Sequence, residues 1–422
     1  MRSEVVYRRF LLSALLLAAP LILVQVAMAQ DVSRLERIAT LIRENKTIEA
    51  ERQLALLLRS KPNEPVALNL MGTIRAKQGR LNEAETLFVR AVVNDPRYSG
   101  ARMNLAYLHL QKREPAKAVV QLKQVLGADP TNTEVMVMLG DAYLATNSFA
   151  EAEEQFLSAL DGRLDNAGAL LGLAQISRAK GEIKETTIYL TRVGTLLADS
   201  KSPELLYKFG LLALQVGMSD AAKAALENAL KVRPNDPAYL LGYGIAWLRK
   251  GDLFEAEKVF RRLIQLQPNS DPAQIHLGYV LLNQKKYDEA RLWLEKSARS
   301  ASPMPEVFYY LGLVAQEQND DAKAISLFEK AVQKLPNYAH ARIALGSSYI
   351  KLRNYPRAKE ELETAVKLDP EEPTAHYNLA LLYARLKDPA RAQEEMRIVE
   401  KLKAKGAGND GVVVLPPNPN PR

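Results

Sequence analysis

The chain has 422 residues, of which 47% are apolar and 25% are charged, so it carries enough apolar side chains to fold. It contains no cysteine, which excludes disulfide bonds, thiolate metal sites and a cysteine nucleophile. The formal net charge is +8, and without any long run of Lys and Arg this mild excess argues against a nucleic-acid-binding surface.

The first 29 residues have the layout of a secretory signal peptide. A short basic stretch, MRSEVVYRRF, precedes the apolar run LLSALLLAAPLILVQV, and the small residues Ala27 and Ala29 follow. This order predicts cleavage after Ala29 and an exported chain, periplasmic or secreted. Pro20 inside the run favours this reading over the alternative, in which residues 10–29 stay in place as an inner-membrane anchor.

Small residues recur beyond this segment with a period of 34 residues, broken once by a two-residue insertion. These markers are Gly72, Ala106, Gly140, Ala174, Gly210, Gly244, Gly278, Gly312, Gly346 and Ala380. Twelve residues after each marker the chain has alanine, except at Thr186, and sixteen residues after it has Phe, Leu or Met. A fixed period of this length predicts a solenoid of stacked repeats.

One period, residues 237–270, illustrates what each repeat contains. Apolar residues at helical spacing predict one helix over residues 238–250 and a second over residues 253–265. Between them, Gly251 and Asp252 supply the residue types that end one helix and begin the next. Each repeat is therefore expected to be a pair of helices joined by a tight turn.

The small residues of this repeat predict how its two helices pack. We expect Gly244 and Ala256 to lie where the helices cross, so that a side chain larger than methyl would push them apart. Trp247 and Phe260 are then expected to fill the space beside the crossing. Glycine inside a helix costs about 1 kcal/mol, which the close approach would offset.

This pattern resembles the tetratricopeptide repeat, in which Leu-Gly, a large residue, Ala, Phe, Ala and Pro stand at set offsets. The segments LGYGIAWLRKGDLFEAEKVFRRLIQLQP and LGSSYIKLRNYPRAKEELETAVKLDP carry the resemblance most clearly. It implies an all-α fold, a right-handed α-solenoid of about eleven 34-residue helix-turn-helix repeats. The expected repeats are 31–64, 65–98, 99–132, 133–166, 167–202, 203–236, 237–270, 271–304, 305–338, 339–372 and 373–406.

Two regions depart from this pattern. Repeat 167–202 is the poorest internal match because it has Ser177 and Thr186, and the insertion lies in its exit loop, LADSKSPE. We expect a local change in superhelical pitch there. Residues 407–422, AGNDGVVVLPPNPNPR, are rich in Gly, Asn and Pro, which predicts a disordered tail with VVVLPP as a possible docking peptide.

The resemblance also implies a binding surface, because positions five and nine of each repeat face the concave side in this family. In the later repeats these positions hold Tyr207, Leu211, Leu241, Ile245, Ile275, Tyr279, Tyr309, Leu313, Ile343, Ser347, Tyr377 and Leu381. In the earlier repeats they hold Asn69, Thr73, Met103, Tyr107, Val137 and Asp141. An apolar, tyrosine-rich groove suits a segment of a partner protein, although packing against the neighbouring repeat is the alternative for each residue.

Motifs that would indicate catalysis are missing from the sequence. The four histidines, His109, His276, His340 and His376, lie in different repeats and form no HExxH motif, so we expect no metal site. The phosphate-binding and nucleophile-elbow motifs are also absent, and we expect no cofactor. Some family members clamp a terminal carboxylate with Lys and Asn at positions five and nine; here these positions are mostly apolar, which argues against that function.

These observations lead to a functional hypothesis. The sequence predicts a non-catalytic scaffold that binds other proteins or peptide segments in its groove. The resemblance places such an exported chain in envelope assembly, secretion or polysaccharide export. The alternatives are a membrane-anchored assembly factor of the same family and an enzyme whose site is built across repeats, and the sequence leaves the oligomeric state open.

Overall fold

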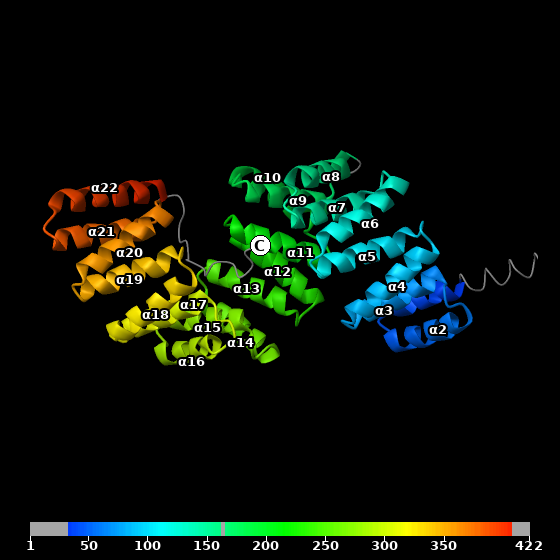
Figure 1. The fold of residues 1–422 in the computed structure, drawn as a ribbon, viewed down its shortest axis with the longest axis horizontal. Coiled ribbons are helices and arrows are strands. Elements are labelled where there is room, and N and C mark those ends of the chain that lie inside the picture. Colours follow the sequence, from blue (N-terminus) through cyan, green and yellow to red (C-terminus); the bar gives the residue numbers. More distant parts are fainter. Residues whose placement is uncertain (1–32, 162–164, 407–422) are drawn as a thin grey trace, which may run out of the picture. The chain divides into compact units, whose positions relative to one another are not determined.

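The computed structural model describes residues 33–161 and 165–406 (Figure 1). All regular secondary structure in these ranges is helical. Every helix in them is too short or too polar to cross a bilayer. The predicted signal peptide at residues 1–29, the candidate anchor at residues 10–29 and the tail at residues 407–422 lie outside the described residues.

Helices follow one another through both ranges with only short turns between them. The first covers residues 33–43. It is followed by α2 (Thr47–Ser60), α3 (Pro65–Lys77), α4 (Leu81–Asn94), α5 (Ser99–Gln111), α6 (Pro115–Ala128), α7 (Thr133–Ala145), α8 (Phe149–Asp161), α9 (Ala167–Ala179), α10 (Ile183–Leu196), α11 (Pro203–Gln215), α12 (Ser219–Val232), α13 (Pro237–Arg249), α14 (Leu253–Leu266), α15 (Asp271–Asn283), α16 (Tyr287–Ala298), α17 (Pro305–Glu317), α18 (Asp321–Lys334), α19 (Ala339–Lys351), α20 (Tyr355–Leu368), α21 (Pro373–Arg385) and α22 (Pro389–Gly406). Each expected repeat therefore contains two helices.

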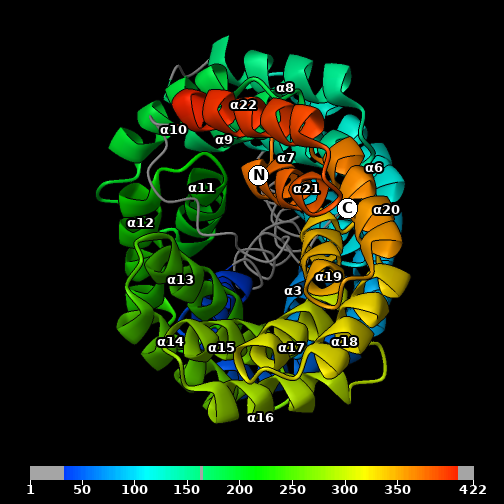
Figure 2. The same cartoon turned by 90° about the vertical axis from the view of Figure 1, so that its left-hand side faces the viewer.

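The chain divides into two compact halves, Met1–Tyr189 and Leu190–Arg422. Within each half, helices pack in chain order, as in the pairs α3 with α4 and α13 with α14. The first helices of successive repeats also touch, for example α11 with α13 and α15 with α17. Figure 2 shows that in the second half the odd-numbered helices lie on the inside of a curve and the even-numbered helices on its outside. The predicted all-α solenoid of helix pairs is confirmed.

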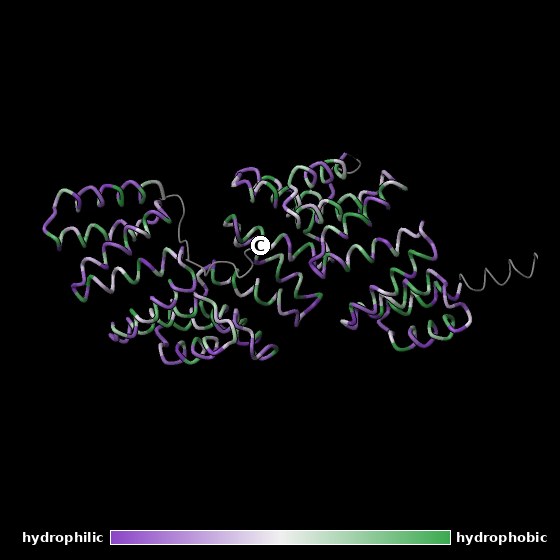
Figure 3. Tube along the Cα trace, viewed as in Figure 1, coloured by the Kyte–Doolittle hydropathy of each residue, from purple (hydrophilic) through white to green (hydrophobic). Residues whose placement is uncertain are grey.

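The division between the halves falls within α10, inside the repeat that matches the pattern least well. The expected change in pitch at this repeat stays a prediction. Along the helices of both halves, apolar residues alternate with polar ones at helical spacing (Figure 3). Burial of these apolar faces between neighbouring helices forms the core.

The turn inside each repeat has the same backbone conformation throughout the chain. In repeat 237–270, Gly251 has φ of 76°, and the side chain of Asp252 accepts a hydrogen bond from the backbone N–H of Glu255 at 3.0 Å. Position fifteen of every expected repeat has positive φ: Asn45, Gly79, Arg113, Asn147, Gly181, Gly217, Gly251, Lys285, Asn319, Arg353 and Lys387. The predicted turn at Gly251-Asp252 is confirmed. A residue with left-handed backbone conformation ends the first helix at the same position of each expected repeat.

The packing of the marker glycines is tighter than the sequence suggested. A β-carbon placed on Gly244 would lie 2.5 Å from Cε1 of Phe260, so a methyl group is already too large. The expectation that only side chains larger than methyl would be excluded is therefore wrong for this repeat. The ring of Phe260 occupies the space at the crossing because glycine leaves it free.

The two exceptions in repeat 167–202 compensate for each other. Ser177 and Thr186 are both buried, and their hydroxyl oxygens are 3.1 Å apart. The hydroxyl of Ser177 also lies 3.1 Å from the carbonyl oxygen of Leu173, and the hydroxyl of Thr186 donates to the carbonyl oxygen of Glu182 at 2.9 Å. Both polar side chains are thus satisfied inside the core.

Candidate partner-binding face

The first helices of the repeats in the second half present a row of partly exposed apolar side chains. Positions five and nine are four residues apart, so they lie on the same side of their helix. We call this surface the inner face. Half-buried on it are Tyr207, Leu211, Leu241, Ile245, Tyr279, Tyr309, Leu313 and Ser347, whereas Tyr377 and Leu381 are exposed.

Two of the predicted residues do not contribute to this surface. Ile275 is 1% exposed and Ile343 is 6% exposed, and both belong to core clusters. Their repeats place these side chains against neighbouring helices, which was the alternative that the sequence left open. We therefore leave Ile275 and Ile343 out of the proposed binding surface.

A chain of aromatic rings leads from the core to the inner face, which it reaches at Tyr279 and Tyr309, while Tyr310 and Tyr338 are buried. The ring centroids of Tyr279 and Tyr310 are 5.2 Å apart, those of Tyr310 and Tyr309 are 5.2 Å apart, and those of Tyr309 and Tyr338 are 5.3 Å apart. Burial raises the pKa of Tyr309 to about 12, and it also raises the pKa of Tyr279. These phenols therefore stay neutral and offer rigid apolar contacts with a hydroxyl at one end. Tyr309 also packs against Phe328, so it supports the core as well as the surface.

Two ionisable side chains beside these rings each have one buried atom without a hydrogen-bond partner among the described residues. The Nε atom of Arg249 on α13 is buried without a hydrogen-bond acceptor, and burial lowers the pKa of this guanidinium. Glu306 on α17 is 7% exposed, its Oε2 atom has no donor, and burial raises its pKa. Arg249 is close enough to Tyr279 for its charge to oppose the rise in the pKa of that phenol. Unpaired buried polar atoms are rare in folded proteins and call for an explanation.

Sequence reasoning missed Arg249 and Glu306. Both stand next to long apolar runs, in the helices PAYLLGYGIAWLR and PEVFYYLGLVAQE, and a charge beside such a run is a signal that burial was possible. Arg249 occupies position thirteen of its repeat and Glu306 position two, whereas the predicted surface residues occupy positions five and nine. Together with Tyr279, Arg249 offers hydrogen-bond donors to an anionic group or a backbone carbonyl of a partner.

In the first half the predicted surface is more polar. Tyr107 is 56% exposed, and Thr73, Met103, Val137 and Asp141 are half-buried. Asn69 is buried instead, where it donates to the hydroxyl of Tyr98 at 3.1 Å and accepts from Asn104 at 2.8 Å. Asn69 therefore helps to hold two repeats together and is not free for a partner.

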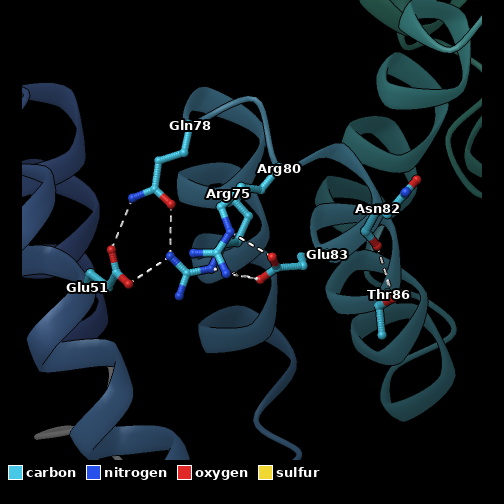
Figure 4. A network of polar contacts seen from close by, with 7 residues as sticks. All are labelled: Glu51, Arg75, Gln78, Arg80, Asn82, Glu83 and Thr86. Carbon is cyan, nitrogen blue, oxygen red and sulfur yellow. Dashed lines mark hydrogen bonds and ion pairs between the residues drawn. The ribbon is translucent and has the colours of Figure 1, made fainter.

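Polar side chains link neighbouring repeats outside the inner face. Arg75 of α3 lies 2.7 Å from a carboxylate oxygen of Glu51 of α2, and Gln78 donates to the same carboxylate at 3.1 Å; Figure 4 shows these three side chains. On its other side Arg75 approaches Glu83 of α4 at 3.5 Å, and Arg80 donates to both oxygens of that carboxylate. Three consecutive helices are joined by one network.

The same kind of link recurs along the chain. A lysine near the turn of one repeat pairs with a carboxylate on the second helix of the repeat before it. The pairs are Lys112 with Glu85, Lys180 with Glu153, Lys250 with Asp220, Lys286 with Glu257 and Lys351 with Asp321. Exposed pairs of this kind contribute little each, so they serve mainly to favour one register between repeats.

One cluster of side chains has the composition of a metal site. The ligand atoms of Glu85, His109 and Glu114 lie within 4.8 Å of one another. Lys112 already forms an ion pair with Glu85, and Lys117 forms one with Glu114. The two ammonium groups balance both carboxylates, and Nδ1 of the buried His109 lies 3.0 Å from Glu114, so these side chains form an ion network.

Of the histidines considered for an enzymatic site, His276 is buried between two repeats. His276 is 2% exposed and stacks on Phe260 with ring centroids 5.2 Å apart. Burial lowers its pKa to about 4. A side chain in this position supports packing between two repeats and offers no surface to a substrate.

Two family models, both described as tetratricopeptide repeat, match the chain. One matches residues 69–133, 207–271, 277–339 and 343–407. The other matches residues 109–165 and 313–368. The first model alone accounts for more than half of the chain.

Curated relatives are similar over part of their length. Cellulose synthase operon protein C of Xanthomonas axonopodis pv. citri is 26% identical over 254 residues, which cover 56% of this chain and 16% of the relative. Cellulose synthase 1 operon protein C of Komagataeibacter xylinus is 26% identical over 245 residues, covering 55% of this chain and 18% of the relative. The chain thus spans less than a fifth of the length of these two proteins.

Among solved structures, the yeast Tom70 is 16% identical, covers 89% of this chain and 96% of its own, and superimposes with a TM-score of 0.45. A tetratricopeptide repeat protein from Parabacteroides merdae is 23% identical, covers 58% of this chain and 97% of its own, with a TM-score of 0.43. The family models match most of the repeats that the helices and their shared turns define. The chain belongs to the tetratricopeptide repeat family.

Proposed function

We propose that this chain is a non-catalytic scaffold that binds a segment of another polypeptide on the inner face of its second half. The observation that carries the proposal is the row of half-buried apolar residues on consecutive first helices, Tyr207, Leu241, Tyr279 and Leu313 among them. Rigid aromatic and aliphatic side chains in a row suit the side chains of an extended or helical segment. Arg249 supplies a charged contact in the middle of this row.

We propose further that the protein works in the cell envelope. The arrangement of residues 1–29 supports export, with residues 10–29 as a membrane anchor in the alternative arrangement. Of the three settings that the family suggests, envelope assembly, secretion and polysaccharide export, the last is favoured by the similarity to two cellulose synthase operon proteins. The partner in this setting is another protein of the export machinery.

The binding surface is tested with a displayed library of random twelve-residue peptides. We expect the full chain to enrich a set of peptides, and the double variant Leu241→Lys/Leu313→Lys to bind them at least about tenfold more weakly, because a buried lysine ammonium disrupts an apolar contact. The matched control is Phe254→Lys/Leu292→Lys. Phe254 and Leu292 are both 64% exposed and lie on the outer helices α14 and α16.

Circular dichroism of both double variants shows whether the helices are intact. Equal binding by the two variants would place the peptide site away from the inner face. Failure of the wild-type chain to enrich any peptide above background would remove support for segment binding itself.

A further inference from the structure

The last repeat exposes a surface that every other repeat buries. Sixteen residues after each marker, the large apolar side chain is at most 2% exposed in nine repeats: Phe88, Leu122, Phe156, Leu190, Leu226, Phe260, Leu294, Phe328 and Leu362. Its counterpart in the last repeat, Met396, is 38% exposed. Likewise Ala358 is fully buried, whereas Ala392 is only half-buried.

These residues line a pocket of about 870 Å³ at the end of the array. We call it the terminal face and define it by Leu381, Ala384, Ala392, Gln393, Met396 and Arg397. The face is formed by α21 and α22. Among the described residues nothing covers it, because α22 is the last helix.

Inside the array, the first helix of the next repeat covers this position. Phe260 is covered by His276, whose ring stacks on it with an interplanar angle of 11°. Phe156 lies directly against Gly172, and Leu226 lies against Gly242. In each case the covering residue stands sixteen positions further along the chain.

Val412 begins the run VVVL, residues 412–415, and Pro416 and Pro417 follow it. The geometry points to this run as the cover of the terminal face, docked as an extended segment against α21 and α22. Three valines followed by two prolines disfavour a helix and favour an extended conformation. The apolar run would replace water on Met396, Ala392 and Leu381, as the next helix does elsewhere.

The length of the intervening chain allows this contact. Met396 precedes the end of α22 at Gly406 by ten residues, which corresponds to about 15 Å along the helix axis. Residues 407–411 span up to about 17 Å when extended. The chain can therefore turn back at the end of α22 and bring Val412 level with Met396.

The inference is independent of the proposed function. The two surfaces share Leu381, which a docked tail would remove from the inner face. Tyr207, Leu241, Tyr279 and Leu313 lie in earlier repeats and stay available to a partner. Loss of tail docking therefore leaves the peptide binding described above intact, and each can fail without the other.

The sequence contains no cysteine, so two introduced cysteines are the only thiols and any intramolecular disulfide must join them. In the full chain, the pair Gln393→Cys/Val412→Cys is compared with Glu394→Cys/Val412→Cys. Gln393 lines the pocket, whereas Glu394 is the next residue on α22 and does not line it. We expect the first pair to form an intramolecular disulfide about tenfold faster than the second.

Nonreducing electrophoresis separates the outcomes. Equal rates for the two pairs would overturn the inference, because they would mean that the tail has no preferred position. Predominant cross-linking between two chains would also overturn it and would assign the terminal face to a second copy.

A second measurement uses amide hydrogen exchange in α22. We expect Val412→Asp/Val414→Asp to speed exchange there by about tenfold, since loss of the cover makes local opening easier. Asn418→Asp/Asn420→Asp adds the same charge to the same tail and is expected to leave exchange unchanged. Equal exchange in wild type and in the valine variant would contradict docking.

Discussion

The ring of Phe260 lies against the bare Cα of Gly244, with room for hydrogen and none for a methyl group. The same arrangement holds for every phenylalanine sixteen residues after a marker. The pairs are Gly72 with Phe88, Gly140 with Phe156, Gly244 with Phe260 and Gly312 with Phe328. Where the marker is alanine, the later residue is Leu122, Leu190 or Met396. Leucine also follows the glycine markers Gly210, Gly278 and Gly346, so phenylalanine at this position goes with glycine, whereas leucine occurs with either marker.

This coupling predicts the effect of Gly244→Ala. The added methyl group would lie 2.5 Å from Cε1 and 2.6 Å from Cζ of Phe260, so we expect a loss of about 1–3 kcal/mol in the free energy of unfolding. Adding Phe260→Leu recreates the combination found at Ala106 and Leu122, and it should recover part of that loss. Urea unfolding followed by tryptophan fluorescence measures both, because Trp247 lies in the same repeat.

Gly127→Ala provides the control for helix propensity. Gly127 lies in α6, where an added β-carbon meets nothing within 4 Å, so alanine should stabilise by up to about 1 kcal/mol. A Gly244→Ala variant that gains stability in the same way would show that Phe260 yields without cost.

The pairing of Ser177 with Thr186 predicts a second coupling. Removing one hydroxyl leaves the other without its side-chain partner, so Ser177→Ala and Thr186→Val should each cost about 1 kcal/mol. The double variant has two apolar groups in contact and should cost less than the two single changes together. A double-mutant cycle read by hydrogen exchange in α9 measures this coupling. Strictly additive effects would mean that the hydroxyls do not interact.

The sequence predicted the helix pairs because their determinants are local. Gly251 and Asp252 define a turn by themselves, and Lys285 and Arg353 adopt the same left-handed conformation because the flanking helices impose it. The exposure of Ile275 was not predictable in this way. It occupies the same position in its repeat as the half-buried Leu241, and its burial depends on the side chains of neighbouring helices.

The charged residues of the inner face were missed for a related reason. Helical spacing identifies which side of a helix an arginine occupies, but not whether a neighbour supplies its partner. Lys250 and Arg249 are adjacent in sequence, yet Lys250 pairs with Asp220, while Arg249 keeps a buried Nε atom without an acceptor. Such a difference arises only from the packing of three helices.

The burial of His276 predicts an acid-sensitive interface between two repeats. Its pKa is about 4 in the fold, against about 6.5 when unfolded, so below pH 6.5 the unfolded chain binds a proton that the folded chain does not. Stability should therefore fall as the pH drops from about 6.5 to about 4, with a loss of about 2 kcal/mol between pH 7 and pH 5 from this residue.

Urea unfolding at pH 7 and pH 5, followed by tryptophan fluorescence, measures the effect because Trp247 and Trp293 flank α15. His276→Phe retains the stacking on Phe260 and should reduce the difference between the two pH values. His340→Phe serves as the comparison, since His340 is only half-buried. An equal pH dependence in wild type and His276→Phe would contradict the prediction.

The unpaired guanidinium of Arg249 predicts which segments the inner face selects. A half-buried cation without an acceptor gains most from an anionic partner, so peptides enriched by the wild-type chain should carry Asp or Glu at a fixed place. Arg249→Gln should weaken their binding about tenfold or more, as expected for a hydrogen bond to a charged group. Arg291→Gln, which removes an arginine already paired with Asp288, should leave binding unchanged.

Added salt should weaken binding of these peptides to the wild type more than to Arg249→Gln, because salt screens the ion pair that Arg249 forms. Selection of the same acidic peptides by Arg249→Gln, with the same Kd, would show that another group on the inner face recognises them.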